Sequence, residues 1–284
     1  MAVPTGAYLA MAVTVGIAFG IHDAVAKLRM EGVDPSSLSL ATLIAGLPLL
    51  GVGLLATGWM RLTPLSGVLF VLAGIVNFAL GRTTMYAATS ELSASGASVM
   101  TATSAVFSVL IGLVMEERVT WNIVVGVGLI VVAVYLISGW SAREATARGV
   151  GLGLLTGLAI ASSVAIIKLG DDTGGSPGLG VIIAYLSGTL ALSPKMRKAA
   201  SILRERPAPI AVMGIAAAFG QLMRYVALTS LGVDVVTPLQ NLRPIVTTLI
   251  LFGMVSPSDK RPRARHWTAA IMAFVGVALV SNLV

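Results

Sequence analysis

The chain has 284 residues, of which 56% are hydrophobic and only 11% are charged, and its formal net charge is +7. Soluble domains carry about 25% charged residues, so this composition argues against a soluble enzyme, a nucleic-acid-binding module and a disordered protein. With no cysteine and only two histidines, we expect no disulfide, no metal site and no other cofactor.

Ten stretches are apolar over about the 20 residues that a transmembrane helix needs. In chain order they are Thr5–Lys27, Ser36–Thr57, Leu65–Thr89, Ser95–Met115, Thr120–Gly139, Val150–Leu169, Pro177–Ser193, Pro207–Thr229, Val235–Val255 and Trp267–Val284. The loops between them are too short for a soluble domain. The sequence therefore predicts an all-α integral membrane protein with ten transmembrane helices.

The two sets of five spans share residues at a nearly constant offset of roughly 140 positions. The matched pairs include Gly16 and Gly157, Lys27 and Lys168, Tyr86 and Tyr225, and Met115 and Met254. Shared apolar composition is the alternative explanation, but the constant order favours a duplication into residues 1–142 and residues 143–284. Two five-span units in tandem enter the membrane in opposite directions, as in the inverted repeats of many secondary transporters.

Three segments carry a resemblance to a known family. They are Gly16 to Gly20 with Lys27-Leu28, Ala97-Ser98 to Phe107 followed by Glu117-Arg118, and Leu231-Gly232 with Arg243-Pro244. On these residues the chain resembles the EamA-type, ten-helix branch of the drug/metabolite transporter superfamily over essentially its whole length. The resemblance implies a ten-helix transporter. The Glu-Arg signature has no counterpart after the ninth span.

Basic residues concentrate in the odd-numbered loops, at Lys27, Arg29, Arg143, Arg148, Lys195, Arg197, Lys198, Arg204, Arg206, Lys260, Arg261, Arg263 and Arg265. The positive-inside rule then predicts cytoplasmic odd loops and both termini outside. The family resemblance implies the reverse orientation, so the two arguments disagree. The stretch Lys195–Arg206 is expected to be a surface loop on anionic headgroups.

Arg243 lies near the middle of the ninth span, between Pro238 and Pro244 and beside Gln240 and Asn241. Proline removes a backbone donor and distorts a helix, and broken polar helices at the membrane midplane are recurrent in transporter sites. We predict that these three polar residues line the binding site, where Arg243 would bind a carboxylate or phosphate. The alternative is an ion pair that only holds helices together.

Arg82 and Arg224 lie late in the third and eighth spans, and Gln221 is the equivalent of Arg82 in the second half. They could form a pair of gate or substrate contacts, or their side chains could extend to the membrane surface. Tyr86 and Tyr225 beside them could close the cavity or bind a ligand, or belong to the interfacial belt.

Asp23 and His22 lie late in the first span. A buried carboxylate beside an arginine is a candidate for proton exchange during transport, and the alternative is a structural partner for Arg82 or Arg243. His22 has a near-neutral reference pKa. Asn77 in the third span is a further candidate for the lining of the cavity.

The sequence thus predicts a secondary active transporter, not an enzyme, in the plasma (inner) membrane. It would move a small anionic or zwitterionic metabolite, such as an organic acid or amino acid, by alternating access, with proton coupling or exchange as options. A flippase for an anionic lipid and an efflux pump of broad specificity are the alternatives. Expected partners are the substrate and membrane lipids, without nucleic acid, and the expected state is a monomer or homodimer.

Overall fold

The computed structural model describes residues 5–57, 60–138, 146–254 and 264–281, and these fold into helices without a strand among them. The first half contains α1 (Thr5–Arg29), α2 (Pro35–Thr57), α3 (Pro64–Gly74), the π-helix η1 (Ile75–Arg82), α4 (Thr83–Ala102), α5 (Ser104–Val114) and α6 (Trp121–Ser138). The second half contains α7 (Ala147–Asp172), α8 (Pro177–Ala191), the 3₁₀ turn η3 (Ser193–Lys195), α9 (Met196–Glu205), α10 (Pro207–Leu228), α11 (Val233–Gln240), α12 (Arg243–Met254) and α13 (Ala264–Val280).

Several helices have the length and apolarity of membrane spans. Five segments qualify on their own. Three of them are the whole helices α1, α7 and α10, the fourth is Pro35–Leu55 of α2, and the fifth is Pro64–Leu92, which runs through α3 and η1 into α4. A sixth arises if α8 and the following segment Ser193–Glu205, bent by 61°, form one broken span. The chain is therefore a helical, multi-pass membrane protein, as the sequence predicted. Shorter apolar helices cover Val99–Val114, Trp121–Leu136 and Ile271–Val280.

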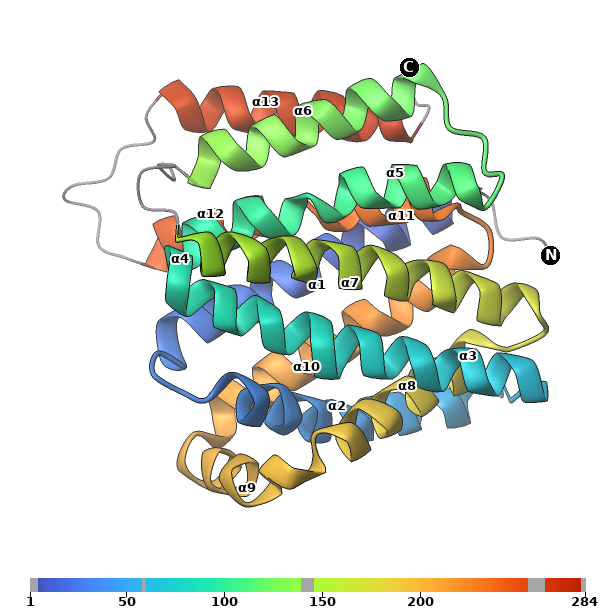
Figure 1. The fold of residues 1–284 in the computed structure, drawn as a ribbon, viewed down its shortest axis with the longest axis vertical. Coiled ribbons are helices and arrows are strands. Elements are labelled where there is room, and N and C mark those ends of the chain that lie inside the picture. Colours follow the sequence, from blue (N-terminus) through green and yellow to red (C-terminus); the bar gives the residue numbers. More distant parts are fainter. Residues whose placement is uncertain (1–4, 58–59, 139–145, 255–263, 282–284) are drawn as a thin grey trace.

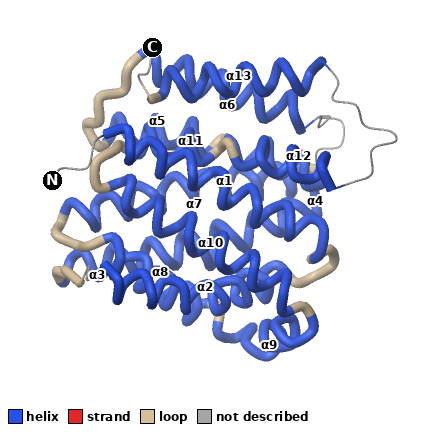
Figure 2. Tube along the Cα trace, turned by 180° about the vertical axis from the view of Figure 1, so that it is seen from behind, coloured by secondary structure: helices blue, strands red, loops and turns tan. Residues whose placement is uncertain are grey.

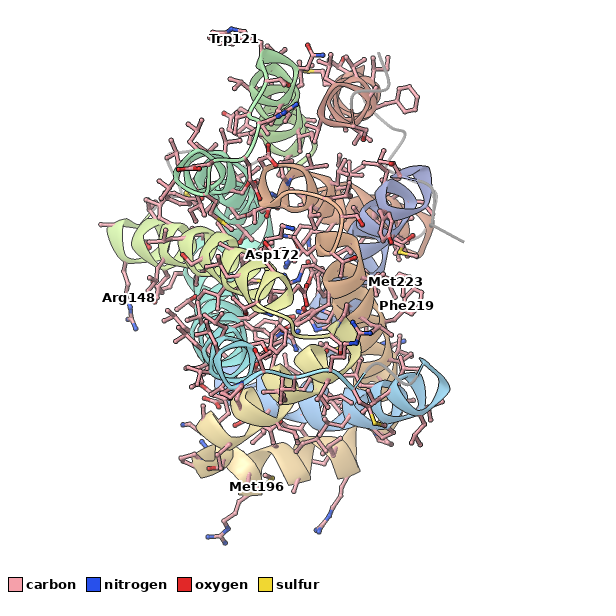
Figure 3. All side chains as sticks on the ribbon, turned by 90° about the vertical axis from the view of Figure 1, so that its right-hand side faces the viewer. Trp121, Arg148, Asp172, Met196, Phe219 and Met223 are labelled. Atoms are coloured by element: carbon pink, nitrogen blue, oxygen red, sulfur yellow. The ribbon has the colours of Figure 1, made fainter. Side chains whose placement is uncertain are left out.

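The long helices run roughly alongside one another (Figures 1 and 2). α6 and α13 pack together at one edge of the molecule, and α9 lies at the opposite edge. In the view along the helices, Trp121 of α6 and Met196 of α9 mark these two edges (Figure 3). α1 begins and α13 ends on the same side of the molecule.

Two of the predicted spans are interrupted. In the fourth, α4 ends at Ala102 and α5 begins at Ser104, with Thr103 as a turn between them. The predicted gap between the third and fourth spans was wrong, because residues 90–94 are helical and belong to α4. In the ninth, α11 ends at Gln240 and α12 begins at Arg243. Pro238 and Pro244 flank this second break, which confirms the broken polar helix expected there.

Small residues let the second break approach α1. A Cβ atom added to Gly16 would lie 3.0 Å from the carbonyl oxygen of Leu239, and one added to Gly20 would lie 2.6 Å from the Cβ of Val246. The hydroxyl of Thr247 also donates to the carbonyl of Gly20 at 3.0 Å. These glycines therefore set the close packing of α1 against α11 and α12.

The π-helix in the third span was not expected. In η1 the backbone hydrogen bonds follow an i→i+5 pattern, and Asn77 and Arg82 both belong to this segment. Both side chains are buried. Such π segments are found frequently at functional sites, and this one supplies three residues to the cavity described below.

The stretch Lys195–Arg206 differs from the loop that the sequence suggested, because most of it forms α9. Ala199 is buried while Arg197, Lys198 and Arg204 are exposed. The small and apolar residues recur at helical spacing, so a helix lying against α2 buries them together. Arg206 after α9 donates to the carbonyl of Arg29, which places α9 next to the end of α1.

Other parts of the predicted pattern lie outside the described residues. These are the basic residues Arg143, Lys260, Arg261 and Arg263, and the ends of three predicted spans at Gly139, Val255 and 282–284.

In the loop before α2, Asp34 accepts hydrogen bonds from the hydroxyl of Ser37 at 2.6 Å and from its amide at 2.9 Å. These bonds hold the pKa of the Asp34 carboxyl below its ordinary value.

Candidate functional site

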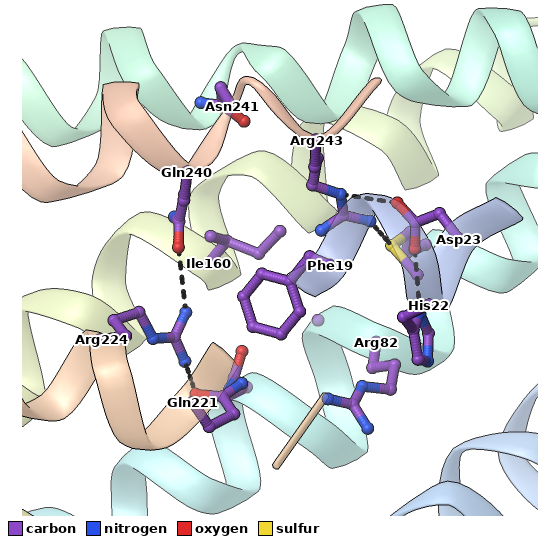
Figure 4. Close-up of a pocket in the computed structure, with 13 residues that line it drawn as sticks. Phe19, His22, Asp23, Arg82, Ile160, Gln221, Arg224, Gln240, Asn241 and Arg243 are labelled. Carbon is purple, nitrogen blue, oxygen red and sulfur yellow. Dashed lines mark hydrogen bonds and ion pairs between the residues drawn. The ribbon is translucent and has the colours of Figure 1, made fainter. Parts of the chain in front are cut away.

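A buried cavity lies among α1, η1, α4, α7, α10, α11 and α12 (Figure 4). Its volume is about 40 Å³, which is room for roughly three water molecules. The side chains that line it are Phe19, His22, Asp23, Asn77, Gly81, Arg82, Met85, Ile160, Gln221, Arg224, Gln240, Asn241 and Arg243. Most of these side chains are polar, so the helices surround a polar centre.

Nine residues singled out in the sequence line this cavity: His22, Asp23, Asn77, Arg82, Gln221, Arg224, Gln240, Asn241 and Arg243. Tyr86 and Tyr225 do not. The hydroxyl of Tyr86 lies 3.1 Å from Nε2 of His22, so Tyr86 contacts a lining residue without lining the cavity itself. Tyr225 is buried against Phe70, with 5.9 Å between the ring centroids. The lining residues come from the first, third, sixth, eighth and ninth predicted spans.

Arg243 at the start of α12 is paired with Asp23 of α1. Its Nε donates to Oδ2 of Asp23 at 2.8 Å, while Oδ1 of Asp23 lies 3.0 Å from Nδ1 of His22. One terminal nitrogen of the guanidinium also contacts the sulfur of Met85 at 2.6 Å. The structural alternative considered for Arg243, an ion pair with Asp23, is thus present, and its charge is balanced within the cavity.

Within the described ranges, no carboxylate pairs with Arg224 of α10. Its side chain is buried to 1% exposure and donates to the side-chain oxygens of Gln221 and Gln240. Both acceptors are neutral amides. In the part of the chain that the structure describes, Nε of Arg224 and Nε2 of Gln240 have no hydrogen-bond partner. Two buried donors are therefore left for another group.

Arg82 at the end of η1 is also buried and also lacks a carboxylate among the described residues. It donates to the hydroxyl of Thr42 at 3.2 Å, and its guanidinium carbon lies 4.8 Å from the ring centroid of Phe78. The ring stabilises the positive charge without neutralising it. The arginine therefore points inward, and the alternative of a side chain extended to the membrane surface is excluded.

Phe19 separates two of the arginines. The guanidinium carbons of Arg224 and Arg243 each lie 5.9 Å from the centroid of its ring, and Figure 4 shows the ring between them. An aromatic face attracts cations. The ring therefore allows two like charges to share one small cavity.

Polar contacts join the first half of the chain to the broken ninth span. The side chains of Asn241 and Ser104 are hydrogen-bonded, with Nδ2 of Asn241 donating at 3.0 Å. The carboxylate of Glu117 accepts the backbone amides of Val233 at 2.9 Å and Asp234 at 3.2 Å. Glu117 belongs to the Glu-Arg pair noted in the sequence, and it caps the first turn of α11.

Sequence reasoning missed four lining residues, Phe19, Gly81, Met85 and Ile160. The internal repeat could have identified three of them. Its offset pairs Phe19 with Ile160, and it pairs Met85 with the candidate Arg224. As apolar residues in apolar spans they did not stand out individually. Among the described residues, no group of three or more His, Asp or Glu side chains is placed to hold a metal ion.

Comparison with known proteins identifies the first half of the chain. Residues 6–139 match the model of the EamA-like transporter family, which confirms over that part of the chain the resemblance noted in the sequence. A search of curated proteins gives no match. Among 19 similar chains of solved structures, one titled "Crystal structure of protein" has a TM-score of 0.75 at 12% identity, with 99% of each chain covered. At this identity the likeness concerns the fold alone.

Proposed function

We propose that this chain, whose residues 6–139 match the model of the EamA-like transporter family, is a secondary transporter of a small anionic or zwitterionic metabolite. The observation that carries the proposal is the polar cavity between the helices, which three arginines and one carboxylate line. Charged side chains inside a membrane protein are costly and usually mark a transport pathway. The family supports transport rather than enzymatic catalysis.

We further propose that residues 1–142 and 143–284 are two inverted repeats of five spans each. Lining residues support this, because Phe19 and Ile160 are equivalent positions, as are Arg82 and Gln221. The two interrupted spans support it as well, since the turn at Thr103 corresponds to the break before Arg243.

The packing of small residues gives a further argument for the repeat. Gly16 of α1 faces the carbonyl of Leu239, just before the break in the ninth span. Its equivalent Gly157 of α7 faces the carbonyl of Met100, just before the turn in the fourth span, and an added Cβ would lie 3.5 Å from that oxygen. A cavity between such repeats is the expected position of a transporter site.

Transport would proceed by alternating access. The cavity of about 40 Å³ is too small for a metabolite, so helices would have to move to admit one. The interrupted α11–α12 span carries Gln240 and Arg243 on its two sides, so movement at the break would change both contacts. Protonation of Asp23 would release Arg243, which offers a route for proton coupling.

The small polar cavity favours a small metabolite over an anionic lipid or a bulky drug. The experiment is uptake of radiolabelled organic acids and amino acids into proteoliposomes made with the purified protein. We expect saturable uptake of at least one acidic compound, dependent on a gradient of substrate or protons. Uptake of cations alone, or movement of fluorescent anionic lipids without any metabolite uptake, would contradict the proposal. Localisation to the plasma membrane is checked by fractionation of cells that express the protein.

A further inference from the structure

The cavity contains more positive than negative charge. Three arginines, Arg82, Arg224 and Arg243, line it together with one carboxylate, Asp23. Asp23 is bound to Arg243, and no described residue forms an ion pair with either of the other two arginines. Two buried guanidinium groups therefore keep an unbalanced charge where counter-charge is scarce.

Two buried N–H donors near this charge could bind an additional acceptor. Gln221 and Gln240 hold Arg224 through their side-chain oxygens, which fixes the guanidinium without cancelling its charge. Nε of Arg224 and Nε2 of Gln240, on side chains that are 1% and 3% exposed, remain without a partner. Carboxylate and phosphate oxygens accept hydrogen bonds and carry the compensating charge.

Arg82 provides a second positive centre in the same cavity. Its guanidinium contacts the hydroxyl of Thr42 and the aromatic ring of Phe78. Neither contact neutralises it. A ligand with one negative charge would balance one arginine and leave the other. A zwitterion would bring no net charge, and its ammonium group would compete with Arg243 for Asp23.

We propose that the cavity selects a small dianion, a dicarboxylate or a phosphate monoester. One anionic group binds Arg224 and Gln240, and the second negative charge faces Arg82. Arg243 stays with Asp23 and does not provide the anion site, which departs from the role that the sequence gave it. The inference rests on the proposed transport function and narrows its substrate class.

The test is binding of four probes to the purified full-length protein in a chloride-free buffer at pH 7.5. Succinate is the dicarboxylate, glycerol 3-phosphate the phosphate monoester, propionate the monoanion and alanine the zwitterion. Binding is followed by the rise in melting temperature and by titration calorimetry. We expect at least one of the two dianions to bind at least tenfold more tightly than propionate and alanine, and the stronger dianion identifies the source of the second charge.

Three variants locate the site. Arg224→Gln and Arg82→Gln should each weaken binding of the better dianion by about 30-fold or more, because each leaves a buried anionic group unpaired. The double variant Asp23→Asn with Arg243→Gln should weaken it by less than Arg224→Gln does. The exposed Arg197→Gln on α9 is the matched control for loss of one positive charge. Arg224→Lys, which retains the charge but not the fork of donors, replaces Arg224→Gln if that variant does not fold.

Equal or tighter binding of propionate or alanine, or no binding of either dianion, would overturn the dianion assignment. The transporter proposal would still stand if the proteoliposomes accumulate another metabolite. A larger effect of the double variant than of Arg224→Gln would return the anion site to Arg243. Absence of uptake for every metabolite class would instead overturn the transport function itself.

Discussion

Asp23 of α1 and Arg243 of α12 are separated by 220 positions in the sequence and joined by an ion pair of 2.8 Å. The pair connects the first half of the chain to the broken span of the second half. Because both side chains are mostly buried, at 20% and 14% exposure, the pair is stronger than a surface contact and more costly to break. It therefore joins α1 to α12 at the cavity.

Removal of one partner of this pair should lower the free energy of unfolding more than removal of both. Asp23→Asn leaves the charge of Arg243 unpaired, and we expect a loss of about 3 kcal/mol in the free energy of unfolding. The double variant with Arg243→Gln should lose less than Asp23→Asn alone. Melting temperatures of the wild type, both single variants and the double variant in one detergent measure the coupling. Additive effects would show that the ion pair does not stabilise the fold.

The glycines of α1 give a prediction about packing. Gly20→Ala places a methyl group 2.6 Å from the Cβ of Val246, so α1 and α12 must separate, and we expect a loss of about 1–3 kcal/mol. Gly151→Ala is the matched control, because an added Cβ there meets no atom within 4 Å. That control should be neutral or slightly stabilising, since alanine favours helix. Melting temperatures decide, and equal values for the two variants would be inconsistent with close packing at Gly20.

Orientation in the membrane can be tested with single cysteines, because the chain has none of its own. The two variants are Ser201→Cys and Ser230→Cys. Ser201 lies on the exposed side of α9, and Ser230 lies in the turn before α11. If the positive-inside rule holds, a membrane-impermeant maleimide added to intact cells labels Ser230→Cys and not Ser201→Cys. Labelling after lysis is the control for accessibility. The opposite pattern would give the orientation that the family resemblance implies.

Asp34 gives a prediction with a defined pH dependence. Its carboxylate caps the start of α2 by accepting hydrogen bonds from the hydroxyl and the amide of Ser37. These bonds, that of the hydroxyl most of all, lower the pKa of the Asp34 carboxyl. A group whose pKa is lower in the folded state stabilises the fold above its unfolded pKa, near 4, and loses that effect as the pH falls. Asp34→Ala should therefore cost about 1 kcal/mol at pH 7 and progressively less below pH 4.

The control for this prediction is Glu31→Ala, an exposed acid in the same loop. Melting temperatures of the two variants and the wild type are compared across pH 3 to 7. A deficit for Asp34→Ala that does not shrink in acid would show that the carboxylate is not the capping group.

The sequence by itself determined the membrane class, most helix bounds and most of the cavity lining. Continuous apolar runs fix helical spans because no water is present to satisfy backbone groups in the membrane. Charged and amide residues inside those runs, such as Arg243 and Gln240, stand out for the same reason. The break in the ninth span was also predictable, because Pro238 and Pro244 remove backbone donors locally.

Only the tertiary structure decided which charges are paired. The sequence identified Arg82, Arg224 and Arg243 as charged residues within apolar spans. It left open whether Asp23 pairs with Arg82 or with Arg243. Close packing of α1 against α12 at Gly20 brings Asp23 to Arg243, while the π-helix turns Arg82 inward without a carboxylate. Pairing depends on distances of a few ångströms between segments far apart in the chain, and no local pattern encodes those distances.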